Sequence, residues 1–154
     1  MNLNMNILCR MLFVIVISSL YGCGDKITTC ALDSINNQTN DISITKGPIS
    51  IIGWIVDLKN NVVPNQVIVR FTDQNGTVYD FVDNSGKKAI RPGVPGAVKS
   101  TNVAMKESGF NFIGDGTQLP NGQYQVSVIF KRMIDYIEYN RESECNVGKN
   151  VTVK

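Results

Sequence analysis

Histidine is absent from the 154-residue sequence. This absence removes the commonest general base, the Ser-His-Asp and Cys-His catalytic arrangements, and most zinc sites. The composition therefore weighs against most hydrolases. We expect a protein that is not an enzyme, with no catalytic residues, no metal site and no cofactor.

An excess of charge of one sign is also lacking. Lysine and arginine together number 15 and aspartate and glutamate number 13, which gives a net charge of +2. Proteins that bind nucleic acid usually carry a strongly basic surface, because the phosphate backbone dominates the affinity. The sequence therefore excludes nucleic acid as an expected partner.

The third absence is an apolar run long enough to cross a bilayer, which takes about 20 residues. The run Met11–Ile17 follows Arg10 and is much shorter, as is typical of the apolar region of a signal peptide. Directly after it come Leu20, Tyr21, Gly22 and Cys23. This stretch resembles the lipobox of bacterial lipoproteins, with an aliphatic residue three positions before the cysteine and a small residue just before it.

The lipobox resemblance implies that residues 1–22 are a lipoprotein signal peptide and that Cys23 is lipidated, with palmitate among the acyl chains. The partner of the protein would then be the membrane itself, through the anchor at Cys23. Gly24 follows the cysteine where an aspartate would imply retention in the inner membrane. The resemblance thus implies an outer-membrane lipoprotein that faces the periplasm or the cell surface. A plain secretory signal, or an N-terminal apolar helix with an unmodified cysteine, is the alternative.

Four cysteines are present, and the lipoprotein interpretation accounts for two of them. Cys9 would leave with the signal peptide and Cys23 would carry the lipid. Cys30 and Cys145 remain in an exported chain, where oxidation is permitted. We therefore predict a disulfide between Cys30 and Cys145, with two free thiols as the alternative.

The rest of the chain indicates an all-β domain. Residues 23–40 are polar and are interpreted as the lipidated cysteine and a flexible tether, with the domain over residues 41–154. Alternating apolar residues predict an edge strand at 42–45 and a hairpin at 67–83 turned by Asn75-Gly76. The stretch 48–58 is apolar on both faces and predicts a central strand. Further strands are expected within 108–115, 118–132, 134–140 and 146–154. Seven to nine short antiparallel strands predict a β-sandwich.

Several short motifs resemble an immunoglobulin-like accessory module of bacterial envelope proteins. They are GWIVD at 53–57, VIVRF at 67–71, SGF at 108–110 and LPNGQYQVSV at 119–128. The resemblance implies an immunoglobulin-like sandwich in which the hydroxyl of Tyr124 bonds back to the preceding corner. Some proteins with this pattern lie beside membrane proteins that handle surface sugars. No catalytic residues are implied.

The long loop over residues 83–101 carries four basic residues: Lys87, Lys88, Arg91 and Lys99. Loops of this length inside a compact domain are uncommon and are often functional. The loop is either a binding loop for an anionic partner, such as lipopolysaccharide phosphates, an acidic glycan or an acidic protein face, or a solvated connector.

The carboxylates leave glycoside hydrolysis open as another function. Asp80, Asp83, Glu138, Glu142 and Glu144 could supply the pair that a glycosidase needs, although solvated surface charges explain them as well. The alternating oxygens of Asp73, Asn75 and Thr77 keep calcium as a further option, without the terminal glutamate of an EF-hand.

The sequence thus predicts an outer-membrane lipoprotein whose sandwich is a binding or structural module for an envelope protein or a surface glycan. The alternative is an enzyme or a metal-dependent module that acts on envelope carbohydrate.

Overall fold

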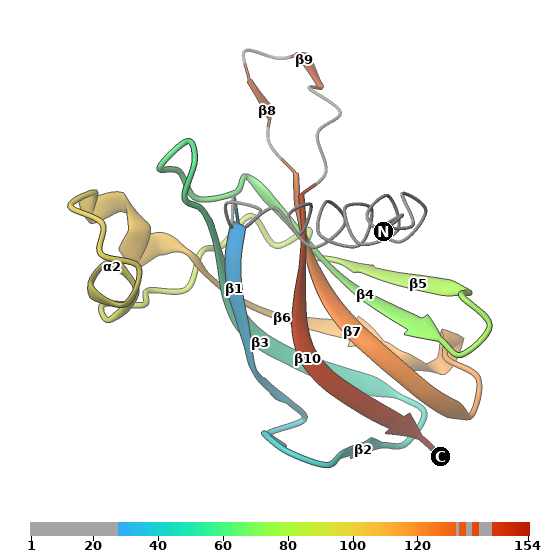
Figure 1. Ribbon diagram of the computed structural model, residues 1–154. Coiled ribbons are helices and arrows are strands. Elements are labelled where there is room, and N and C mark those ends of the chain that lie inside the picture. The colour runs from blue at the N-terminus through green and yellow to red at the C-terminus, as the bar shows by residue number, and fades with distance from the viewer. Residues whose placement is uncertain (1–27, 132, 135–136, 139–142) are drawn as a thin grey trace, which may run out of the picture.

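The protein is an all-β domain in the computed structural model, which describes residues 28–131, 133–134, 137–138 and 143–154 (Figure 1). Two sheets face each other across one core, and a two-stranded ribbon extends from one end. The ribbon consists of β8 (Met133–Ile134) and β9 (Ile137–Glu138). All described strands lie within residues 28–153, so a chain that starts at residue 24 keeps the whole described domain.

The smaller sheet has the strand order β1-β3-β6. Its strands are β1 (Thr28–Ile35), β3 (Pro48–Asp57) and β6 (Gly109–Asp115). The prediction that the strand around Trp54 is central is confirmed, because β3 pairs with both neighbours. Gly53 is required there, since a Cβ atom at this position would lie 2.5 Å from the carbonyl oxygen of Ala31 and 2.6 Å from the ring of Phe110.

Strand β1 corrects the predicted tether over residues 23–40. Thr28–Ile35 pairs with β3 along its whole length and places Leu32 and Ile35 in the core. The tether prediction is wrong for these residues, and the domain includes residues before 41. The register shifts between Leu32 and Ser34, which breaks the alternation of apolar residues and hides the strand in the sequence. Residues 23–27 lie outside the described part of the chain.

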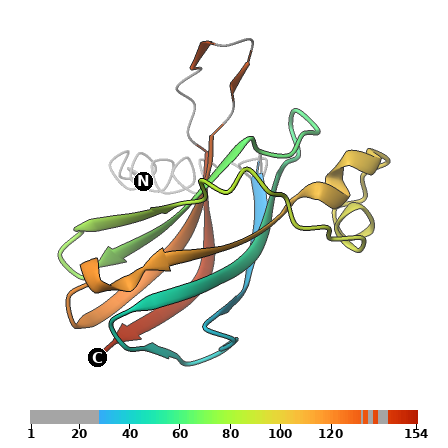
Figure 2. The same cartoon turned by 180° about the vertical axis from the view of Figure 1, so that it is seen from behind.

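The larger sheet has the order β2-β10-β7-β4-β5 and curves around the core (Figures 1 and 2). Its strands are β2 (Ile42–Ile44), β4 (Gln66–Asp73), β5 (Val78–Val82), β7 (Gly122–Lys131) and β10 (Ser143–Val153). The predicted edge strand is confirmed as β2, and the predicted hairpin is confirmed as β4–β5. Gly76 adopts a φ of +83° in its turn, a conformation that glycine reaches at little cost.

One strand pair departs from the antiparallel prediction. Strand β2 runs parallel to β10, with Ile42 opposite Val151 and Ile44 opposite Val153. The chain leaves the smaller sheet after β1, turns, and joins the edge of the larger sheet as β2. The prediction of all-antiparallel pairing from short turns is therefore wrong for this pair, because short turns do not determine which sheet the strand joins.

The core is built from the inward-facing residues of both sheets. Ile51 and Phe110 come from the smaller sheet, and Phe71 and Val128 come from the larger one, all essentially without solvent exposure. Aromatic rings meet edge-on in this core, such as Phe71 of β4 with Phe81 of β5 at a centroid distance of 5.1 Å. Burial of these faces is the main stabilising term of the fold.

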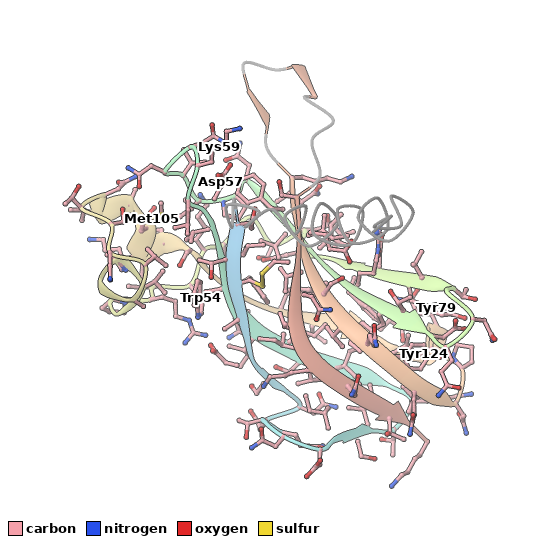
Figure 3. The ribbon with its side chains drawn as sticks, viewed as in Figure 1. Trp54, Asp57, Lys59, Tyr79, Met105 and Tyr124 are labelled. Atoms are coloured by element: carbon pink, nitrogen blue, oxygen red, sulfur yellow. A yellow bond between two sulfur atoms is a disulfide. The ribbon has the colours of Figure 1, made fainter. Side chains whose placement is uncertain are left out.

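Tyr124 closes the turn before β7, as the sequence predicted. Its ring is buried, and its hydroxyl donates a 2.7 Å hydrogen bond to the carbonyl oxygen of Pro120 (Figure 3).

We expect Tyr124→Phe to lower the free energy of unfolding by about 1 kcal/mol, because one hydrogen bond is lost while the ring stays packed. Urea denaturation followed by circular dichroism measures this change. Tyr79→Phe is the control, and an equal loss in both variants would contradict a specific role for the Pro120 bond.

Candidate functional site

The disulfide joins the two sheets at one end of the domain. Cys30 on β1 and Cys145 on β10 are bonded, with their Cα atoms 6.2 Å apart. This is the pairing that the sequence predicts. Cys23, the predicted lipidation residue, lies outside the described residues, as does the predicted signal peptide over residues 1–22.

Residues 83–108, which we call the projecting segment, connect β5 to β6 and extend away from the two sheets (Figures 1 and 2). The segment contains the short helix α2 (Val94–Ala97) and the 3₁₀ helix η2 (Val103–Glu107). Val94 and Met105 pack on Val56 of β3, with Trp54 at the border of this second, smaller core (Figure 3). The backbones of Ala89 and Gly109 exchange two hydrogen bonds. The predicted loop is thus folded, and Val94 and Met105 hold its base on the outer face of the smaller sheet near the end of β3.

The four predicted basic residues differ in their surroundings. Lys87 and Lys88 are exposed and line a small hollow whose walls include Asp83 and Glu107. Lys99 is exposed just after α2.

Arg91 instead forms an ion pair with Asp33 of β1 and is half-buried, so it fastens the projecting segment to the smaller sheet. The structure therefore leaves three of the four predicted residues at the surface for a partner. Lys106 of η2 is a fourth exposed lysine of the segment. The sequence-based prediction missed it because it lies beyond the predicted end of the loop.

A second hollow lies on the outer face of the larger sheet, and we call it the distal hollow. Its volume is about 460 Å³. Thr28 pairs with the last residue of β3, and Figure 1 shows this end of β3 on the opposite side of the domain from the β4–β5 turn and the start of β7, which surround the hollow. The lining residues are Thr72, Asp73, Gln74, Gly76, Gln123, Tyr124, Gln125 and Asn150.

Strand register creates the distal hollow. Thr72 lies opposite Gln125, and Gln125 lies opposite Asn150, so these three side chains form one row across β4, β7 and β10. Gln74 donates a 3.3 Å hydrogen bond to Gln123 at the rim. Sequence reasoning missed this site. The only local signal was the pair of polar residues, Gln123 and Gln125, that alternate with the buried Tyr124.

Asp73 is the single charged residue of the distal hollow. The backbone N–H of Thr77, helped by that of Asn75, lowers the pKa of Asp73 below its usual value. The carboxylate is therefore ionised at neutral pH, and it organises the turn. The alternating oxygens of Asp73, Asn75 and Thr77 thus belong to a hydrogen-bonded turn.

The carboxylates considered for glycoside hydrolysis make other contacts where their side chains are described. Asp80 accepts two 2.7 Å hydrogen bonds from Arg70, and Glu144 accepts one from Ser127. Asp83 accepts a hydrogen bond from the backbone N–H of Ser85. Glu142 and the side chain of Glu138 lie outside the described part of the chain. Within that part, no three side chains of His, Cys, Asp or Glu gather to hold a metal ion.

No known protein family matches this chain, and no curated protein is significantly similar to it in sequence. Among the described residues, no helix has the length and apolar character needed to span a bilayer.

Proposed function

We propose that the protein is a lipid-anchored lipoprotein of the bacterial outer membrane, and that its domain is an immunoglobulin-like sandwich that binds a ligand without catalysing a reaction. The ligand that the geometry favours is a surface glycan. An envelope protein is the alternative partner.

Three features support the immunoglobulin-like assignment. The sheets have the orders β1-β3-β6 and β2-β10-β7-β4-β5, with the first part of the chain shared between the two sheets. The disulfide links one sheet to the other. The bond from the Tyr124 hydroxyl to Pro120 corresponds to the tyrosine corner of such sandwiches.

The predicted anchor would fix the orientation of the domain. Five residue steps separate Cys23 from Thr28, and a fully extended chain of that length spans at most about 18 Å. The end of the domain that carries Thr28 would then be held near the bilayer. The ten-residue strand β3 spans roughly 33 Å, so the distal hollow at the other end would face away from the lipid.

The observation that carries the proposed ligand is the chemistry of the distal hollow. Gln123, Gln125 and Asn150 contribute exposed amides, each of which both donates and accepts hydrogen bonds. A saccharide presents hydroxyl groups that do the same. Val78 is 49% exposed beside Thr72 and offers an apolar contact for a sugar ring. The negative charge of Asp73 disfavours an acidic ligand here, so we propose a neutral glycan.

The experiment measures binding of the chain from residue 24 to 154 to cell envelopes whose phospholipids have been extracted with solvent, so that glycan and protein are the ligands on offer. We expect binding to survive protease treatment of the envelopes and to be lost after periodate, which cleaves the vicinal diols of glycans. Gln123→Ala combined with Gln125→Ala should weaken binding about ten-fold or more, because two hydrogen-bonding side chains are lost.

The matched control removes two exposed amides outside the hollow, Asn111→Ala with Gln118→Ala, and should bind as the parent chain does. Loss of binding after protease, with no effect of periodate, would assign the site to an envelope protein. Unchanged binding of the Gln123 and Gln125 variant would refute the hollow as the binding site.

A further inference from the structure

The projecting segment concentrates positive charge. Residues 83–108 contain five basic and two acidic residues, whereas the whole chain has a net charge of only +2. Four of the five basic residues, Lys87, Lys88, Lys99 and Lys106, are exposed. The remainder of the chain is therefore slightly acidic, and the basic surface is local.

Exposed apolar side chains accompany these lysines. Ile90 is 57% exposed and Val103 is 66% exposed, and together they make up half of the large apolar residues that are exposed in the described part of the chain. Lysines next to exposed aliphatic side chains are typical of surfaces that bind the interface of a bilayer, where the charges contact headgroups and the apolar groups enter the acyl boundary.

The projecting segment leaves the domain at the end that carries Thr28. It begins after Val82, which lies opposite Ile68 near the start of β4, and it ends at Gly109, which lies opposite Trp54 near the end of β3 (Figure 1). The turn after β3 adds the exposed Lys59 at the same end (Figure 3).

The segment is held in place by the Arg91–Asp33 ion pair and by the packing of Val94 and Met105. Its lysines are thus presented by a folded element, which loses less conformational entropy on binding than a free loop would.

We propose that the projecting segment is a membrane-docking surface that binds the anionic headgroups of the bilayer in which the protein is anchored. This inference rests on the proposed anchor at Cys23, because the short link from Cys23 to Thr28 brings the segment to the lipid surface. The positive charge of the lysines matches the negative charge of the headgroups, and the short link holds the segment near the lipid. Both observations favour the bilayer as the binding partner of this surface. The distal hollow then remains free for the glycan.

The test uses the chain from residue 24 to 154, which has no lipid, and phosphatidylcholine vesicles with and without phosphatidylglycerol. We expect co-sedimentation only with the vesicles that contain phosphatidylglycerol, and a decrease as salt shortens the screening length. Lys87→Ala combined with Lys88→Ala should weaken vesicle binding about 25-fold, five-fold for each lysine. Ile90→Ser with Val103→Ser should also weaken it, whereas Ile113→Ser, at an exposed apolar residue of β6, should not.

The matched charge control is Lys46→Ala with Lys154→Ala, which removes two exposed lysines near the opposite end of the domain and should leave vesicle binding unchanged. Circular dichroism verifies that each variant is folded. Equal binding to both kinds of vesicle, or equal weakening by both lysine pairs, would overturn the proposal. Absence of vesicle binding would also overturn it. Lipid labelling of Cys23 in cells tests the anchor independently, so failure of the docking surface can be distinguished from failure of the anchor.

Discussion

Replacing Cys30 and Cys145 with alanine is expected to lower the free energy of unfolding by about 4 to 5 kcal/mol on the chain-entropy model of a cross-link. The large value follows from the sequence separation of 115 residues, since a long closed loop restricts the unfolded chain strongly. Most domains are stable by only about 5 to 15 kcal/mol. The variant should therefore be near the limit of stability.

The position of the disulfide gives it a second expected role, as a restraint on strand β1. Among the described strands, β1 lies at the edge of the smaller sheet and pairs there with β3 alone. The bond from Cys30 to Cys145 ties β1 to the larger sheet as well. Any force from an anchor at Cys23 would enter the domain through β1, so we expect the bond to prevent this strand from separating.

Urea denaturation of the chain from residue 24 to 154 measures the loss. The parent chain under reducing conditions should match the double variant, and Cys30→Ala alone should be equally destabilised. A loss below about 1 kcal/mol would show that the cross-link contributes little. In the exported protein, both cysteines should resist alkylation under denaturing, non-reducing conditions.

Local patterns predicted much of this fold. The β4–β5 hairpin was predictable because Asn75-Gly76 separates two alternating runs, and turn chemistry acts over a few residues. Strand β3 was predictable because both of its faces are apolar, as expected for a central strand. The bond of Tyr124 to Pro120 was implied by the resemblance of LPNGQYQVSV to immunoglobulin-like modules, and it joins residues only four positions apart.

Features that depend on long-range register could not be predicted. The distal hollow combines Gln74, Gln123 and Asn150, which come together only because β7 pairs with both β4 and β10. Likewise, Arg91 counted as a free basic residue in the sequence, but the fold places it against Asp33 of β1. Short-range alternation contains no information about which strands become neighbours.

Replacing Cys23 with serine is expected to abolish lipidation completely and to leave residues 1–22 attached, because the lipobox resemblance implies that the cysteine sulfur accepts the lipid. Several acyl chains, at about 0.8 kcal/mol for each buried methylene, make such an anchor effectively permanent. The change lies outside the described domain, so the stability of that domain should be unaffected. Thermal unfolding of the variant and the parent protein provides this control.

The proposed anchor would determine which end of the domain faces the bilayer and which end is free to bind the proposed glycan. Mass spectrometry of the N-terminal peptide from the membrane fraction tests it most directly, together with palmitate labelling of the parent protein and Cys23→Ser. We predict a first residue of Cys23 that carries acyl chains, and no labelling of the variant. An unmodified Cys23 in the exported protein, or labelling of the variant at the level of the parent, would refute the lipid anchor.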